Sequence, residues 1–281
     1  MSQYSNNSIL SKLTLGKATD YSQCYDPNLL QGVPRTLNRE QLSITADSLP
    51  FYGEDVWYGY ELSWLNNKGK PVVAVAEFRF SCTSVNIVES KSFKLYLNSF
   101  NQSCFSTWQD VQAVMIKDLT NIVEGDVKVT LFNVEECPAL AIMPNDYICI
   151  DEQDIEITNY QLDPEHLKFP ETNNTVSEKL VSHLLKSNCL ITNQPDWASI
   201  YIEYQGNKIC HQALLKYLIS FRQHNEFHEQ CVERIFIDLM NYCQLESLTV
   251  FARYTRRGGL DINPYRSTKH SSAPNLRTLR Q

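Results

Sequence analysis

The order of apolar and polar residues in the first half of the chain predicts a β-hairpin, two amphipathic helices and a further strand. β-Branched and aromatic residues fill two runs, which the turn-forming residues Asn-Asn-Lys-Gly-Lys separate. Beyond them, apolar residues recur at helical spacing, and Thr107 can cap the second helical run. The expected elements are strands at 56–64 and 72–80, a turn at 66–70, helices at 93–100 and 107–119, and a strand at 127–131.

The second half of the chain repeats this order. We expect a strand at 197–204, a turn at 205–208, helices at 211–223 and 226–243, and a strand at 248–254. The motif Tyr-Leu-x-Ser-Phe-x-Gln at 96–102 recurs at 217–223, and Asp-Leu at 118–119 recurs at 238–239. Two amphipathic helices can be similar by chance, but the matching order of elements favours a tandem duplication of one α+β module.

The segment between the halves has the composition of a connector. Prolines interrupt it at positions 138, 144, 164 and 170, and an acidic run surrounds residues 151–156. We therefore expect an N-terminal module at 1–135, a connector at 136–180 and a C-terminal module at 181–281.

The two halves differ where chemically active residues lie. Glu-Ser-Lys at 89–91 corresponds to Cys-His-Gln at 210–212, and Phe-His-Glu at 227–229 corresponds to Phe-Ser-Thr at 105–107. Each copy lacks what the other has kept. This complementarity predicts one site that draws on both halves.

Composition narrows the class of protein. The 281 residues are 43% hydrophobic, enough for a packed core, and the net charge of −7 argues against a broad basic face for nucleic acid. The cysteine count, nine, is odd, and no Cys-x-x-Cys pair occurs, which favours free thiols in a reducing compartment and no structural zinc. Neither a signal-peptide pattern nor a long apolar span is present, so we expect a cytoplasmic protein.

Cys189 and Asp196 are the first candidates for chemistry. A thiolate is a strong nucleophile, although most cysteines are buried structural residues. Polar residues at 188 and 192–194 surround Cys189, which predicts an exposed loop. Asp196 precedes Trp197, and a carboxyl group packed against an indole loses solvation and becomes a proton donor. The ordinary alternative is an aspartate that caps a turn.

His228 and Glu229 lie in the first turn of a predicted helix. A carboxylate there can accept hydrogen bonds from the N–H edge of a planar ring, or can simply complement the helix dipole. Phe227 can stack on such a ring or belong to the core.

Two basic stretches are candidates for anion binding. Ser90, Lys91 and Lys94 fall within two helical turns at 89–96 and could equally be a solvated face. Arg-Arg-Gly-Gly at 256–259 combines guanidinium groups with glycines that let backbone N–H groups approach a phosphate; the alternative is a glycine turn at a strand end. No Gly-x-Gly-x-x-Gly motif is present, so a Rossmann nucleotide site is not expected.

These motifs together resemble the QueF-type nitrile reductases, which are NADPH-dependent 7-cyano-7-deazaguanine reductases. Residues 89–96, Glu-Ser-Lys-Ser-Phe-Lys-Leu-Tyr, satisfy the family motif. The segment 189–196, the pair 228–229 and the run 256–264 match as well. Leu190 follows the cysteine, as in the longer two-module form of the family.

The resemblance implies an α+β fold of tandem tunnelling-fold (T-fold) modules, each an antiparallel four-stranded sheet backed by two helices. It implies that Cys189 attacks the nitrile carbon to form a covalent thioimide and that Asp196 donates a proton. NADPH is the implied source of both hydrides, and no metal is implied. The implied substrate-binding residues are Val88, Glu89, Ser90, Phe227, His228 and Glu229, and the implied NADPH contacts are Ser90, Lys91, Arg257 and Gly258.

The expected function is reduction of 7-cyano-7-deazaguanine to the aminomethyl base in queuosine biosynthesis. The resemblance implies a homodimer that acts on the free base, with no nucleic-acid or membrane partner. One alternative is a T-fold thiol hydrolase that binds a purine or pterin and uses no reductant. A second is a ligand-binding module without catalytic activity.

Overall fold

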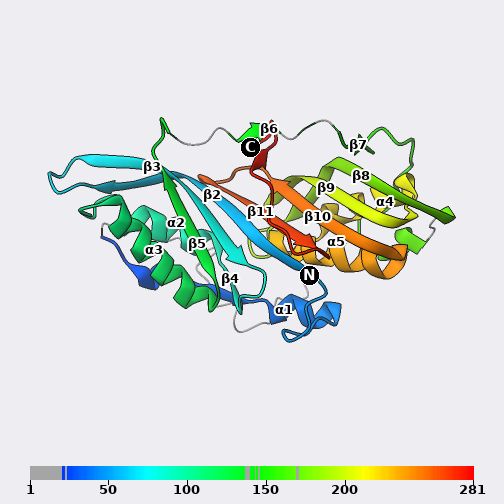
Figure 1. Ribbon diagram of the computed structural model, residues 1–281, viewed down its shortest axis with the longest axis horizontal. Coiled ribbons are helices and arrows are strands. Elements are labelled where there is room, and N and C mark those ends of the chain that lie inside the picture. Colours follow the sequence, from blue (N-terminus) through cyan, green and yellow to red (C-terminus); the bar gives the residue numbers. More distant parts are fainter. Residues whose placement is uncertain (1–20, 23, 137–139, 143, 145, 169–170) are drawn as a thin grey trace. The chain divides into compact units, whose positions relative to one another are not determined.

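The computed structural model describes residues 21–22, 24–136, 140–142, 144, 146–168 and 171–281 (Figure 1). Residues 1–20, Cys137, Pro138 and Pro170, which entered the sequence predictions, lie outside this part. The chain forms two compact units. The first comprises Met1–Glu40, Asp55–Ala139 and Arg256–Asp261, and the second comprises Gln41–Glu54, Leu140–Thr255 and Ile262–Gln281.

The first unit contains the predicted hairpin and both predicted helices. Strand β3 (Pro71–Ser81) lies between β2 (Tyr52–Leu65) and β5 (Val127–Phe132), and pairs antiparallel with β5. Alternate residues of β3 are buried, and they form the core with helices α2 (Ser90–Ser99) and α3 (Trp108–Val123). The Phe93 ring of α2, for example, meets the edge of Phe78 at 4.9 Å.

Local signals fix the ends of these elements. The Asn66 N–H donates to the Lys70 carbonyl at 2.9 Å, which closes the hairpin turn where it is predicted. Thr107 caps α3 in a reciprocal arrangement with Asp110. The remaining short elements of this unit are the 3₁₀ turn Pro27–Leu29, strand β1 (Gly32–Pro34), helix α1 (Thr36–Arg39) and strand β4 (Asn86–Val88), which pairs antiparallel with β1. The 3₁₀ turn Glu40–Leu42 spans the boundary to the second unit.

The second unit has a larger sheet. Its strand order is β11 (Leu260–Ser267), β10 (Leu245–Tyr254), β9 (Pro195–Lys208), β8 (Glu171–Asn188) and β7 (Ile148–Cys149). The pairs from β11 to β8 are antiparallel, as the fold prediction requires, and β7 adds a short parallel edge. Helix α5 (His228–Cys243) packs against β9 and β10, and α4 (His211–Ser220) against β8.

The rest of the second unit consists of short elements. They are strands β6 (Ala141–Ile142) and β12 (Leu276–Arg277), which pair parallel, and 3₁₀ turns at Pro164–Lys168 and Phe221–Gln223.

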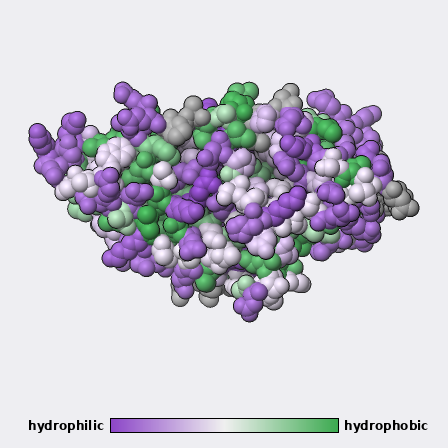
Figure 2. All heavy atoms as spheres, in the orientation of Figure 1, coloured by the Kyte–Doolittle hydropathy of each residue, from purple (hydrophilic) through white to green (hydrophobic). Residues whose placement is uncertain are grey.

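In the view of Figure 2, hydrophilic residues dominate the visible face and hydrophobic residues lie among them in smaller groups.

Two sequence predictions are wrong in this unit. Residues 205–208 are not a turn but the end of β9, where the pairing register shifts. Gly206 belongs there because a Cβ at this position would lie 2.8 Å from Leu245 Cα, so only glycine lets the strands approach. Residues 171–180, assigned to the connector, form the first half of β8.

The helix pairs of the two units support the predicted duplication. Helices α2 and α4 have 10 residues each, and α3 and α5 have 16 each. The longer helices both end at a residue in the left-handed conformation, Glu124 and Gln244. In each pair a tyrosine of the short helix donates to an aspartate of the long one. These bonds join Tyr96 to Asp118 at 2.8 Å and Tyr217 to Asp238 at 2.6 Å.

The helix ends also correct one detail of the sequence alignment. Ser90 and His211 both open the short helix, as predicted. The long helices open at Trp108 and His228, so Phe-His-Glu at 227–229 corresponds to Thr-Trp-Gln at 107–109, two residues beyond the predicted counterpart. The conclusion that the first copy lacks the His-Glu pair is unchanged.

Candidate active site

Cys189 and Asp196 flank the turn of one β-hairpin. Near the end of β8, Ser187 lies opposite Asp196 and Asn188 lies opposite Pro195 of β9. The Cys189 N–H then donates to the Gln194 carbonyl at 2.8 Å. Because side chains alternate along a strand, Cys189 shares the face of Ser187, and therefore of Asp196. Diagonal neighbours of this kind have Cβ atoms about 7–8 Å apart or less. The strand register thus places the thiol and the carboxyl group on the same face of the hairpin.

The prediction that Cys189 is exposed is wrong. Its exposed fraction is 5%, and that of Asp196 is 6%. The Cys189 carbonyl accepts the Asn193 N–H at 3.1 Å, which closes a tight turn, and Asn193 takes a left-handed φ of 56°. Polar residues at the turn suggested a loop open to water, but the turn is tight and Cys189 is buried.

The start of α5 brings further groups to this hairpin. His228 Nε2 lies 3.6 Å from Asp196 Oδ1, an ion pair when the imidazole is protonated. The His228 ring also stands edge-on to the Tyr254 ring, 4.0 Å between centroids. Phe227 and Glu229, on either side of His228, are buried. Four predicted residues, Cys189, Asp196, His228 and Glu229, therefore belong to one region of the second unit.

Sequence reasoning missed Tyr254, which lies behind His228. Burial raises the pKa of its phenol well above the ordinary value, so it stays neutral. Burial likewise raises the pKa of the nearby Cys231 thiol, which makes Cys231 a poor rival to Cys189 as a nucleophile. In the sequence Tyr254 is the last residue of a predicted strand, and this position does not predict a contact with a residue of α5.

Glu89, in the first unit, caps helix α2. Its two carboxylate oxygens accept the N–H groups of Lys91 and Ser92, each at 2.7 Å. The residue is fully buried, and this burial raises the pKa of the carboxyl group, against the lowering effect of the two N–H groups and of Lys94 and Lys91. Val88, the last residue of β4, is buried beside it.

The predicted anion-binding residues of the first unit come together. Gly258 and Gly259 form a two-residue turn between Arg257 and Leu260, and both have positive φ, 59° and 72°. A Cβ on Gly258 would lie 3.1 Å from Lys94 Nζ, so the glycine turn meets the helix face one turn beyond Ser90 and Lys91. Lys94 beside the glycine turn suits a phosphate group, and the Glu61 carboxylate, 2.7 Å from a Cβ placed on Gly259, adds a negative charge at the same turn.

Arg256 lies two residues before this glycine turn. Its guanidinium lies over the Tyr60 ring at 3.5 Å, and the Tyr60 hydroxyl donates to Asp261 at 2.7 Å. The arginine is exposed but held in place by this stack.

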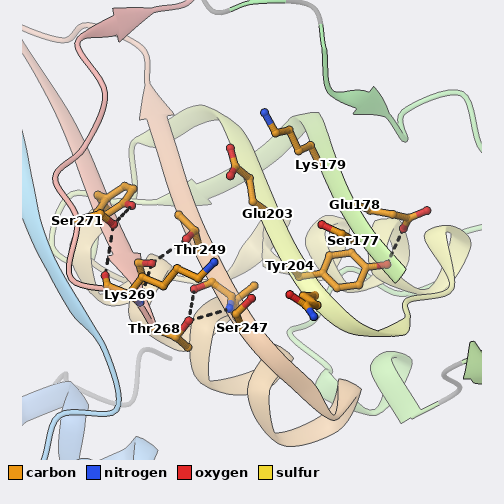
Figure 3. A pocket seen from close by; sticks show the side chains of 14 residues that line it. Ser177, Glu178, Lys179, Glu203, Tyr204, Ser247, Thr249, Thr268, Lys269 and Ser271 are labelled. Carbon is orange, nitrogen blue, oxygen red and sulfur yellow. Dashed lines mark hydrogen bonds between the residues drawn. The ribbon is translucent and has the colours of Figure 1, made fainter. Parts of the chain in front are cut away.

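A separate hollow of about 250 Å³ lies on the sheet of the second unit (Figure 3). Side chains of β8, β9, β10 and β11 and of the segment after β11 line it, and none of the predicted site residues is among them. Three of its charged side chains already have partners: Lys179 pairs with Asp146 at 2.8 Å, Glu203 accepts the Tyr147 hydroxyl, and Glu178 accepts the Tyr204 hydroxyl. We therefore do not place the active site there.

Metal and membrane sites find no support in the part of the chain that the structure describes. No group of three or more His, Cys, Asp or Glu side chains there could hold a metal ion. None of the described helices combines the length and the apolar character that a membrane span needs.

Comparison with known proteins assigns the family. Residues 21–131 match the model described as "Nitrile reductase, 7-cyano-7-deazaguanine-reductase N-term", and residues 195–273 match "QueF-like protein". A protein of Colwellia psychrerythraea named "NADPH-dependent 7-cyano-7-deazaguanine reductase" is 65% identical over 286 residues, with 100% of both chains covered. The chain belongs to the 7-cyano-7-deazaguanine reductase family. The resemblance noted in the sequence is thereby confirmed.

Membership of the 7-cyano-7-deazaguanine reductase family agrees with the α+β architecture of two similar units, the fold class expected from the motifs. Among solved structures, the apo form of an archaeosine synthase QueF-Like is 16% identical. It covers 36% of this chain and 100% of its own, with a TM-score of 0.30.

Proposed function

We propose that this protein reduces the nitrile of 7-cyano-7-deazaguanine to a primary amine with NADPH, as a step of queuosine biosynthesis. The identity of 65% over the full length to a reductase of that name carries the proposal. The hairpin that holds a thiol and a carboxyl group on one face supports it, because these are the two groups that nitrile capture needs.

In this proposal Cys189 is the nucleophile that attacks the nitrile carbon. A bond forms between Sγ and the nitrile carbon while one π bond of the C≡N group breaks, and the nitrogen takes up a proton to give a thioimide. Asp196 is the proton donor, since it lies on the same face as Cys189 and 3.6 Å from His228. After one reduction at carbon the Cys189 thiol leaves, and reduction of the resulting imine gives the amine.

Two carboxylates are the proposed anchors of the deazaguanine ring. Glu229, buried beside His228, and Glu89, at the start of α2, would accept hydrogen bonds from the N–H groups of the amino-pyrimidinone edge. Phe227 would cover the ring, and Val88 and Ser90 would contact the substrate next to Glu89.

NADPH supplies the two hydride equivalents when it is bound. Ser90, Lys91, Arg257 and Gly258 are the proposed contacts, and the close approach of Lys94 to the glycine turn supports a phosphate position beside them. Arg257 and Lys91 give this site the positive charge that the additional phosphate of NADPH requires.

The proposal includes a homodimer in the cytoplasm that acts on the free base. The acidic net charge of −7 supports the absence of a tRNA partner.

The test combines nicotinamide absorbance with intact-protein mass. With NADPH and 7-cyano-7-deazaguanine, the reductase consumes NADPH and forms the amine, and without NADPH Cys189 gains the mass of the nitrile. The Cys189→Ala variant should show neither. Ammonia release without NADPH consumption would establish a thiol hydrolase instead, and unchanged properties of Cys189→Ala would establish a binding module.

A further inference from the structure

Asn225 ties the turn that carries Cys189 to the start of α5. Its Nδ2 group donates to the Cys189 carbonyl at 3.3 Å and to Asn193 Oδ1 at 3.0 Å. Its Oδ1 atom accepts from Asn188 Nδ2 at 3.3 Å. The carbonyl of Cys189 can only accept, which fixes the orientation of the Asn225 amide. The Asn225 side chain thus bonds to Asn188 at the end of β8 and to Cys189 and Asn193 in the turn.

The backbone around Asn225 reinforces these bonds. The Asn188 N–H donates to the His224 carbonyl at 2.8 Å, and the Glu226 N–H donates to the Asn188 carbonyl at 3.1 Å. This short parallel bridge runs the segment 224–226 along the end of β8. The nucleophile turn and this segment are 36 residues apart in sequence, so the contact is a product of the fold.

The segment 224–226 is itself anchored to α5. Glu226 is buried, and it pairs with Arg234 at 2.6 Å, two turns into the helix. His224 Nε2 lies 3.1 Å from the other oxygen of Glu226. Asn225 is therefore a rigid link between Cys189 and the residues that follow it, Phe227 to Glu229.

We propose that Asn225 is a positioning residue, which holds the Cys189 sulfur in register with the substrate bound at Phe227, His228 and Glu229. This inference rests on the proposed function and deepens it. Asn225 is not expected to touch the substrate. Its side-chain amide bonds to Asn188, Cys189 and Asn193, at the end of β8 and in the turn. Its removal should therefore slow formation of the bond between sulfur and the nitrile carbon, while the affinity for the substrate remains.

The test measures thioimide formation in the absence of NADPH, by rapid mixing with 7-cyano-7-deazaguanine and intact-protein mass. For Asn225→Ala and for Asn225→Asp, which keeps the size but replaces the donor, we expect the rate at saturating nitrile to fall about tenfold or more. The half-saturating concentration should stay within about twofold of the wild type, the limit for a residue outside the binding contacts.

Asn207→Ala is the matched control. Asn207 lies near the opposite end of β9, where its amide donates to Gln244 at 3.1 Å, and its loss should leave the rate unchanged. Hydrogen exchange adds a readout that needs no substrate: amides of 189–194 should exchange faster in Asn225→Ala than in the wild type and in the control.

Each outcome decides between the claims. Absence of an adduct in the wild type refutes the proposed function, and exchange then still reports whether Asn225 holds the turn. An adduct that forms at the wild-type rate in Asn225→Ala, or an effect on affinity alone, overturns the positioning role. Loss of the fold in both variants would make Asn225 a structural residue and overturn it as well.

Discussion

Glu89 has a structural task that can be separated from its proposed role in substrate binding. Replacing it with alanine removes both acceptors at the start of α2. Loss of a side-chain cap costs about 0.5–2 kcal/mol. The Ser92 N–H is also buried, and a buried donor without a partner costs about 1–3 kcal/mol. Burial disfavours the ionised form of the Glu89 carboxyl group, so its removal recovers part of the lost stability. We therefore expect Glu89→Ala to lower the free energy of unfolding by about 2–3 kcal/mol.

Glu89→Asp separates the two tasks. Aspartate is among the preferred residues at a helix start and can accept the same N–H groups, so the free energy of unfolding should change by less than about 1 kcal/mol. Its carboxylate, however, is one methylene shorter and withdrawn from the ligand. Loss of one charge-assisted hydrogen bond, about 1.5–3 kcal/mol, should lower kcat/KM by about 10- to 100-fold.

The assays are urea unfolding followed by circular dichroism and NADPH consumption at varied nitrile concentration. If Glu89→Asp loses as much stability as Glu89→Ala, the capping argument is wrong. If Glu89→Asp keeps the wild-type kcat/KM, Glu89 does not anchor the substrate. Only a stable variant with impaired turnover agrees with both tasks.

Three further predictions follow from buried charges and hydroxyls. Arg266 is fully buried and bonds to Glu233 at 2.8 Å, so Arg266→Met should cost about 3–5 kcal/mol in urea unfolding, and the double variant Arg266→Met/Glu233→Leu less. Tyr217→Phe should cost about 1–3 kcal/mol of stability in thermal unfolding, and more than Tyr96→Phe. The reason is that Asp118, the partner of Tyr96, keeps a second donor, the Tyr25 hydroxyl at 2.5 Å. Burial alone would raise the pKa of Glu226, but His224 and Arg234 outweigh burial and lower this pKa. The stability that Glu226 contributes is therefore fully present above the pKa that it has in the unfolded chain. This stability is lost as the pH falls through the lower pKa of the folded protein. Unfolding free energies measured from pH 7 to pH 3 should therefore decline less steeply in Glu226→Gln, and an equal slope would contradict this.

The predictable part of the fold depends on local signals. The turn at 66–70 and the cap at Thr107 act within a few residues, and the structure contains both where they were expected. The failure at 205–208 has the opposite cause. Gly-Asn resembles a turn in the sequence, but pairing of β9 with β8 and β10 keeps these residues extended, and that pairing involves residues far along the chain.

The candidate site shows the same division. The motif residues Cys189, Asp196 and His228 were found from sequence, whereas the face that Cys189 and Asp196 share depends on strand register. The burial of Cys189 and its bond to Asn225 depend on packing between segments that no sequence pattern connects. Composition predicts which residues are polar, but not which of them will be covered.

The two copies of the duplicated helix pair differ in how their helices begin, and this difference follows the chemistry. In the first copy Glu89 and Thr107 both accept N–H groups at a helix start. In the second copy the equivalent residues, Cys210 and Phe227, have no such bond. A side-chain N-cap contributes about 1 kcal/mol, and the second copy lacks this contribution at both helices. At α5 the Gln230 side chain accepts the Phe227 N–H at 3.3 Å instead. At α5 the position lies beside His228 and Glu229, where an apolar ring is the proposed cover for a planar base. The interior bonds, Tyr96 to Asp118 and Tyr217 to Asp238, are the same in both copies, and in the second copy loss of Tyr217 would take this donor away from the buried Asp238. Divergence has therefore occurred where the helices begin, and the packing that defines the module has been kept.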